Sequence, residues 1–197
     1  MIFTTAMLRN KYKDYANPLD KIKREIRNKT FSRINRGIYE DAKEVNPYML
    51  AGIILSPSYI SFDFALSYYG LIPEKVVAIT CASLNQRKRK TFINDFGRYE
   101  YQDIPENAFS EGVTCIFEND YVARIATKEK AICDSLCKWR VVHNINELKG
   151  LLFVDKRIDE DEFNECDFKL LLRLAKLYHK TNLDLLISLI RKEYYHE

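Results

Sequence analysis

Residues 17–29 constrain the fold most, because they carry several independent signals of one amphipathic helix. Asparagine is a favoured N-cap and proline is preorganised for the first helical position, so Asn17-Pro18 predicts a helix start. Asp20 lies in the first turn, where a negative charge suits the helix dipole. At about 100° per residue, Leu19, Ile22 and Ile26 share one face. The stripe predicts packing on a preceding short helix, which begins near Thr4 and ends near Tyr12.

The segment after this helix predicts a two-stranded hairpin. Residues 30–34 alternate polar and apolar side chains, and residues 35–37 include a glycine that can turn the chain with a positive φ. Ile38 and Tyr39 then return antiparallel to the first strand. The order helix, helix, hairpin is typical of a minimal winged helix-turn-helix, which we expect to span residues 1–45.

The opposite face of the predicted second helix carries long cationic and amide side chains. Lys21, Arg24 and Asn28 are expected to point away from the apolar stripe, with Arg27 to one side, as a recognition helix in a major groove requires. Cations in the hairpin suit phosphates or a minor groove. The alternative is a solvated surface helix. The candidate DNA-binding residues are Lys21, Lys23, Arg24, Arg27, Asn28, Arg33 and Arg36.

Charge is distributed unevenly along a chain whose formal net charge is only +3. Residues 9–36 hold 10 basic and 3 acidic residues, whereas residues 155–167 hold 7 acidic and 2 basic residues. This asymmetry favours a nucleic-acid-binding end and an acidic, solvated segment elsewhere. Alternatively, both segments are solvent-exposed surfaces that bind no partner.

Residues 46–197 are expected to form a larger α+β domain after a polar linker at residues 40–45. Helices are predicted at 46–55, 62–69, 127–140, 145–152, 168–179 and 183–195, with Ser61 and Thr127 as caps and Gly70 as a left-handed exit. Strands are predicted at 58–60, 76–82, 90–94, 98–103, 113–118 and 121–126. This pattern indicates helices around a mostly antiparallel sheet.

A second basic cluster lies between two of these strands. It is either a secondary nucleic-acid contact or a solvated hairpin tip. Cations on a flexible loop can bind phosphates, but their presence does not by itself indicate nucleic-acid binding. The aromatic residues that follow are interpreted as core rather than as a stacking platform for single strands. The cationic residues of this cluster are Arg87, Lys88, Arg89 and Lys90.

No pattern in the sequence favours catalysis, and we expect no cofactor and no metal. Asp63 is explained by the dipole of the helix that it begins. Cys133 and Cys137 share a helix face but have no second ligand pair, so they are interpreted as core cysteines. Asp167-Phe168-Lys169 has the letters of a nuclease motif but lies at a predicted helix start. Five cysteines without paired spacing are typical of reduced thiols in a cytoplasmic protein.

Three blocks resemble the AbiEi-type antitoxins, the regulator halves of bacterial abortive-infection toxin–antitoxin pairs. The first covers residues 20–27 and 31–39, the second and most specific covers residues 57–72, and the third covers residues 126–136. In the third block Thr127 and Lys128 replace the usual lead-in to the family's Pro-Glu-Lys-Ala helix start.

The resemblance implies an autorepressor that binds inverted repeats in operator DNA upstream of its own operon. It also implies a C-terminal domain that counters a nucleotidyltransferase toxin encoded beside it, without a stable complex. Two other functions compete with this one: a protein-interaction module without specific DNA binding, and a metal-dependent nuclease that uses Asp63 or Asp167.

Overall fold

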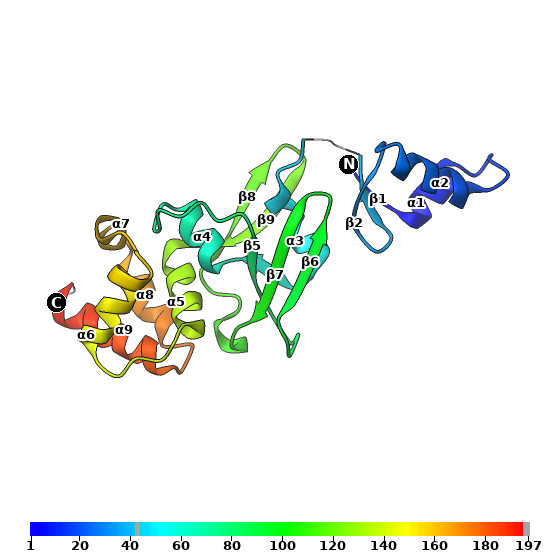
Figure 1. Cartoon of the computed structure of the whole chain (residues 1–197). Coiled ribbons are helices and arrows are strands. Elements are labelled where there is room, and N and C mark those ends of the chain that lie inside the picture. Colours follow the sequence, from blue (N-terminus) through cyan, green and yellow to red (C-terminus); the bar gives the residue numbers. More distant parts are fainter. Residues whose placement is uncertain (42–43, 195–197) are drawn as a thin grey trace.

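The computed structural model describes residues 1–41 and 44–194, and these residues form a mixed α+β fold (Figure 1). The predicted linker includes residues 42 and 43, which lie outside the described residues. Residues 1–41 are called the N-terminal unit below, and residues 44–194 are called the large unit. Within the described residues, no helix combines the length and apolar character needed to cross a membrane.

The N-terminal unit contains two helices and an antiparallel sheet in the order β1-β3-β2. Its elements are β1 (Ile2–Thr4), α1 (Thr5–Lys11), α2 (Pro18–Arg27), β2 (Ser32–Asn35) and β3 (Ile38–Glu40). Both predicted helices and the hairpin are confirmed, and Gly37 turns the hairpin with the expected positive φ of +76°. The sequence did not predict β1, which adds a third strand to this hairpin.

The large unit is built on a mixed sheet in the order β6-β7-β5-β4-β9-β8. Its strands are β4 (Ser58–Ile60), β5 (Ile79–Ser83), β6 (Lys90–Asn94), β7 (Gly97–Asp103), β8 (Val113–Glu118) and β9 (Tyr121–Ala126). The β4–β5, β6–β7 and β8–β9 pairs are antiparallel, whereas β5–β7 and β4–β9 are parallel. The predicted strands are therefore confirmed, with β5 three residues later than expected.

Helices cover both faces of this sheet (Figure 1). They are η1 (Pro47–Leu50), α3 (Ala51–Ile54), α4 (Phe62–Tyr68), η2 (Glu106–Ala108), α5 (Lys128–Lys138), α6 (Ile145–Lys149), η3 (Gly150–Asp155), α7 (Glu160–Asn164), α8 (Phe168–Ala175) and α9 (Thr181–Glu193). On one face, the hydroxyl groups of Tyr99 and Tyr101 donate to the backbone oxygens of Pro47 and Ala51, at 2.8 and 2.7 Å. Tyr59 on the other face bonds to Asp134 of α5.

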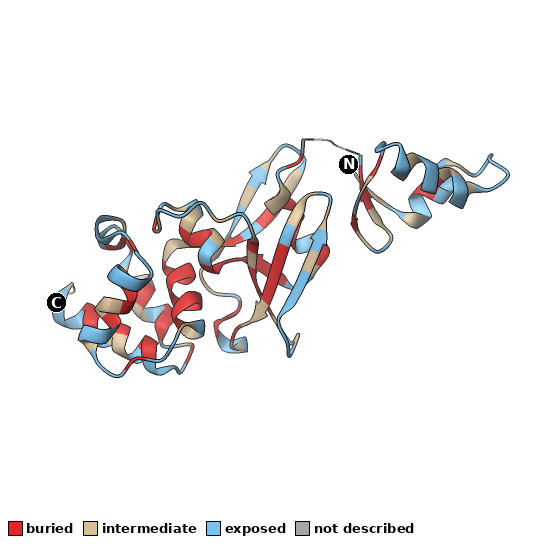
Figure 2. Ribbon diagram, in the orientation of Figure 1, coloured by how far each residue is buried: buried red, intermediate tan, exposed pale blue. Residues whose placement is uncertain are grey.

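Buried residues concentrate in the sheet and in the helices that pack on it, whereas α1 and α2 are mostly exposed (Figure 2). Tyr99 and Tyr101 are fully buried and Phe92 packs against the same core, which confirms the interpretation of these aromatics as core. The acidic segment was expected to be solvated; it contains α7, a short helix that the sequence did not predict.

Candidate nucleic-acid interface

A small separate core holds α2 against the rest of the N-terminal unit. Leu8, Ile22, Phe31 and Tyr39 are buried together, and Ile26 packs against them. The predicted start of α2 is confirmed, because the side-chain oxygen of Asn17 accepts a hydrogen bond from the backbone N–H of Asp20. These contacts fix one face of α2 and leave the opposite face to solvent.

The predicted apolar stripe is wrong at one of its three positions. Leu19 is 45% exposed, whereas Ile22 is 3% exposed. Leu19 lies in the first turn of α2 and does not belong to the small core around Ile22. Phe31, which the sequence assigned only to the hairpin, takes its place in the core. α2 is therefore anchored through its middle and through the chain that follows it.

Arg24, Arg27 and Asn28 are exposed at the C-terminal half of α2. Within residues 1–41 and 44–194, neither arginine forms an ion pair. Both line a surface cavity of about 430 Å³ between α2 and the segment that precedes it. Two exposed guanidinium groups without an ion pair among the described residues, beside an exposed amide, are suited to phosphates and to the base edges of a major groove.

Lys21 does not point outward as the sequence predicted. Its ammonium group forms an ion pair with Glu25, one turn along α2, and the side chain is only 19% exposed. It also lies 5.2 Å from the ring centroid of Tyr15 and 5.7 Å from that of Tyr12. The hydrogen bond with Glu25 raises the pKa of Lys21 and lowers that of Glu25. Lys21 therefore stabilises the packing of α2 beside α1.

Lys23 remains exposed and pairs with Asp20 at 3.1 Å. Exposed pairs of this kind contribute only about 0–1 kcal/mol, so Lys23 stays available to another anion. It extends the exposed cationic face of α2 toward the start of the helix.

The hairpin places Arg33 and Arg36 in different surroundings. Both are exposed, but the backbone N–H of Arg33 donates to Asp95 of the large unit at 3.4 Å. The side-chain Nε of Arg33 donates to the backbone oxygen of Asn35 at 3.3 Å. Arg36 lies at the turn beside Gly37 and is the hairpin cation farthest along the tip.

The second basic cluster is held in a fixed loop by Asp103. The Asp103 carboxylate accepts from the backbone N–H groups of Gln86 and Arg87, at 2.6 and 2.8 Å. Arg89 forms an ion pair with Glu100, and the Lys90 ammonium donates to the side chain of Gln86 at 2.5 Å.

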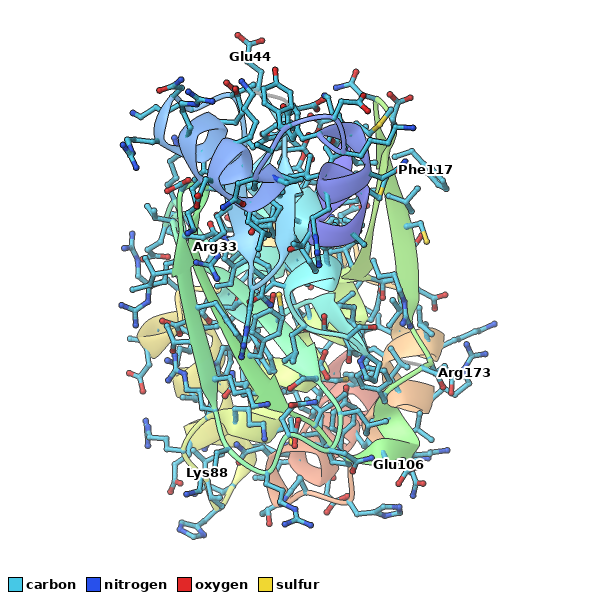
Figure 3. All side chains as sticks on the ribbon, turned by 90° about the vertical axis from the view of Figure 1, so that its right-hand side faces the viewer. Arg33, Glu44, Lys88, Glu106, Phe117 and Arg173 are labelled. Atoms are coloured by element: carbon cyan, nitrogen blue, oxygen red, sulfur yellow. The ribbon has the colours of Figure 1, made fainter. Side chains whose placement is uncertain are left out.

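Arg87, Lys88 and Lys90 are then the cations of this loop without an ion pair among the described residues. In Figure 3 Lys88 lies at the lower edge of the view, whereas α1 and α2 lie at its upper edge. The structure does not bring the two predicted basic sites together.

A buried polar cluster that the sequence did not predict lies between the sheet and α5. Lys130 and Asp134 are both fully buried and form an ion pair at 3.1 Å. Asp134 also accepts hydrogen bonds from the hydroxyl groups of Tyr59 (3.0 Å), Ser61 (2.6 Å) and Tyr178 (2.6 Å). The only advance signal is the four-residue spacing of Lys130 and Asp134, which places them on one helix face.

This cluster changes the role expected for Ser61. The Ser61 hydroxyl does not cap α4, because it donates to Asp134. Thr80 of β5 accepts from the backbone N–H of Phe64 instead, at 3.0 Å. The cluster is sealed inside the large unit, so it joins the sheet to α5 and α8–α9 rather than presenting groups to a ligand.

The residues considered for a nuclease or metal site lie apart in the fold, at the starts of α4 and α8 and within α5. Asp167 caps α8 by accepting from the backbone N–H groups of Lys169 and Leu170. Asp63 is exposed in the first turn of α4, and Cys133 is fully buried. Among the described residues, no group of three or more His, Cys, Asp and Glu side chains is arranged to hold a metal ion.

Comparison of the chain with models of known protein families gives no match, and comparison with curated proteins gives none either. The resemblance to AbiEi-type antitoxins therefore rests on the three residue blocks given above.

Proposed function

We propose that the chain is a DNA-binding transcriptional regulator whose N-terminal unit is a minimal winged helix-turn-helix. The element order β1-α1-α2-β2-β3 supports this proposal, with α2 as recognition helix and the β2–β3 hairpin as wing. The observation that carries it is the exposed face of α2. Arg24, Arg27 and Asn28 are exposed there, and neither arginine forms an ion pair among the described residues, while Ile22 holds the opposite face in a core.

We further propose, from the resemblance, that the protein is a cytoplasmic autorepressor and antitoxin. Its operator would lie upstream of its own operon, and its function would be to counter a nucleotidyltransferase toxin encoded beside it. In this proposal the large unit carries the antitoxin activity and has no enzymatic role.

Arg24→Ala is expected to weaken operator binding by about 1–3 kcal/mol, because a base-reading contact is lost. The measurement is fluorescence anisotropy on a duplex from the upstream region, beside a random duplex of equal length. The preference for the upstream duplex is expected to shrink as well.

Arg191→Ala is the matched control, since Arg191 is an exposed arginine of α9 at the far end of the chain. It removes the same charge and is expected to leave operator affinity within about twofold. Equal affinities for Arg24→Ala and the unmodified protein would remove α2 from the interface. A protein without any preference for the upstream duplex would instead favour the interaction-module alternative.

A further inference from the structure

The β2–β3 hairpin is bound to the large unit as well as to its own sheet. Ile34 of β2 is 3% exposed, and it belongs to the core of the large unit rather than to the small core around Ile22. Figure 1 shows β2 on the side of the N-terminal unit that faces the large unit, with α1 and α2 beyond it. The hairpin therefore connects the exposed face of α2 to the large sheet.

Two asparagine amides lock this contact. Asn35 donates from Nδ2 to the backbone oxygen of Ile54, at the end of α3, over 2.9 Å. Asn94, the last residue of β6, donates from Nδ2 to the backbone oxygen of Ile34 over 2.8 Å. The two bonds run in opposite directions across the contact, so each unit supplies one donor and one acceptor.

Both amides are themselves held in place by their other atom. The side-chain oxygen of Asn94 accepts from the backbone N–H groups of Phe96 and Gly97, at 2.9 and 3.2 Å. The side-chain oxygen of Asn35 accepts from the backbone N–H of Arg36 at 2.7 Å. The oxygen of each amide is therefore bound within its own turn, and the nitrogen is bound across the contact between the units. Because both ends of the amide are held, the side chain has little rotational freedom.

A second contact lies at the other end of the hairpin. Glu40, at the end of β3, is 1% exposed, and the N-terminal ammonium group of Met1 donates both to the Glu40 carboxylate, at 2.6 Å, and to the Tyr121 hydroxyl at the start of β9, at 3.2 Å. Burial and a hydrogen bond with Glu40 raise the pKa of Tyr121 above its ordinary value. Contacts at both ends of a short hairpin oppose a hinge motion between the two units.

We propose that Ile34, Asn35 and Asn94 are positioning residues, which fix the direction of α2 relative to the large unit. The effect on DNA rests on the proposed function. Two copies that read an inverted repeat must place their recognition helices about 34–36 Å apart. If the orientation of α2 is already fixed in each copy, less conformational entropy is lost when both helices bind at that spacing. Docking buries Ile34 of β2 against the large unit, and the cationic side chains that the hairpin leaves exposed to DNA are those of Arg33 and Arg36.

The double variant Asn35→Asp/Asn94→Asp tests this proposal. Aspartate keeps the side-chain oxygens that accept from Arg36, Phe96 and Gly97, so both local turns persist. It removes only the two donors and sets a carboxylate against each backbone oxygen. The matched control is Asn146→Asp/Asn164→Asp, the same change at two exposed asparagines of α6 and α7.

Small-angle X-ray scattering of the full chain is the first measurement. The unmodified protein and the control are expected to fit one rigid shape, whereas the double variant is expected to need an ensemble with a larger maximum dimension. Circular dichroism checks that all three proteins are folded. A double variant that scatters as the unmodified protein does would overturn the docking.

Anisotropy on a two-repeat duplex and on a single-repeat duplex is the second measurement. The ratio of the two affinities is the readout, because the added charges weaken binding to both duplexes. We expect this ratio to fall about tenfold in the double variant, because the contact between the units would no longer hold the recognition helices of the two copies at the spacing of the repeats. An unchanged ratio, with altered scattering, would overturn the positioning role. If the unmodified protein bound neither duplex specifically, the proposed function would fail, and scattering would still decide the docking.

Discussion

Asp134→Ala is expected to lower the free energy of unfolding by about 3–5 kcal/mol, because it leaves the buried ammonium group of Lys130 without its carboxylate. Among the described residues, Lys130 would keep hydrogen bonds to the backbone oxygen of Ala108 and to the hydroxyl of Tyr178, both at 2.5 Å, neither of which carries a compensating negative charge. Burial raises the pKa of Tyr59 and Tyr178 far above ordinary tyrosine, so their hydroxyl groups stay protonated and would lose an acceptor. Urea denaturation followed by circular dichroism measures the loss.

A second variant separates the unpaired charge from the missing contacts. Lys130→Met/Asp134→Leu removes both charges and keeps comparable volume, so it is expected to recover much of the stability. If Asp134→Ala cost less than about 1 kcal/mol, the cluster would not join the sheet to the helices as the geometry indicates.

Gly112→Val is expected to destabilise the large unit by about 2–5 kcal/mol, through two additive causes. Gly112 has a φ of +73°, which β-branched residues rarely adopt. A Cβ atom there would also lie 3.0 Å from Lys130 Cβ and 3.0 Å from a methyl group of Leu174. The backbone oxygen of Gly112 accepts from Thr127, the cap of α5, so the strain reaches the start of that helix.

Gly70→Val is the matched comparison, because Gly70 has a φ of +76° but no atom within 4 Å of the added Cβ. It is expected to show the backbone cost alone, about 1–2 kcal/mol. Thermal unfolding of both variants gives the difference. If the two variants lost equal stability, the segment around Gly112 would be able to shift away from α5, and its close packing there would not contribute to the free energy of unfolding.

The sequence predicted the parts of the fold whose signals are local. Strands at residues 90–94, 113–118 and 121–126 appear at the expected positions, because alternating side chains and tight turns mark them within a few residues. The start of α2 was predictable for the same reason, since the Asn17 cap and Pro18 are adjacent to the helix. The Thr127 cap of α5 follows the same rule.

The parts that it missed depend on residues far apart along the chain. β1 has only three residues, and its identity as a strand comes from pairing with β3 about 36 residues later. Helical periodicity placed Lys21 opposite Ile22, but Tyr12 and Tyr15 attract its ammonium group toward α1. The ion pair of Lys130 is hidden in the sequence, because a lysine four residues before an aspartate is usually a surface pair.

The burial of Ile34 limits how this protein can be taken apart or recombined. Cutting the chain near residue 42 would remove the side chain of Ile34 from the core of the large unit. The backbone oxygen of Ile54 would also lose the hydrogen bond that it accepts from Asn35. A chimera that joins residues 1–41 to another domain would need a surface on that domain with the same contacts that α3 and the end of β6 provide. For the same reason, substitutions in the hairpin are expected to destabilise the large unit as well as the N-terminal unit.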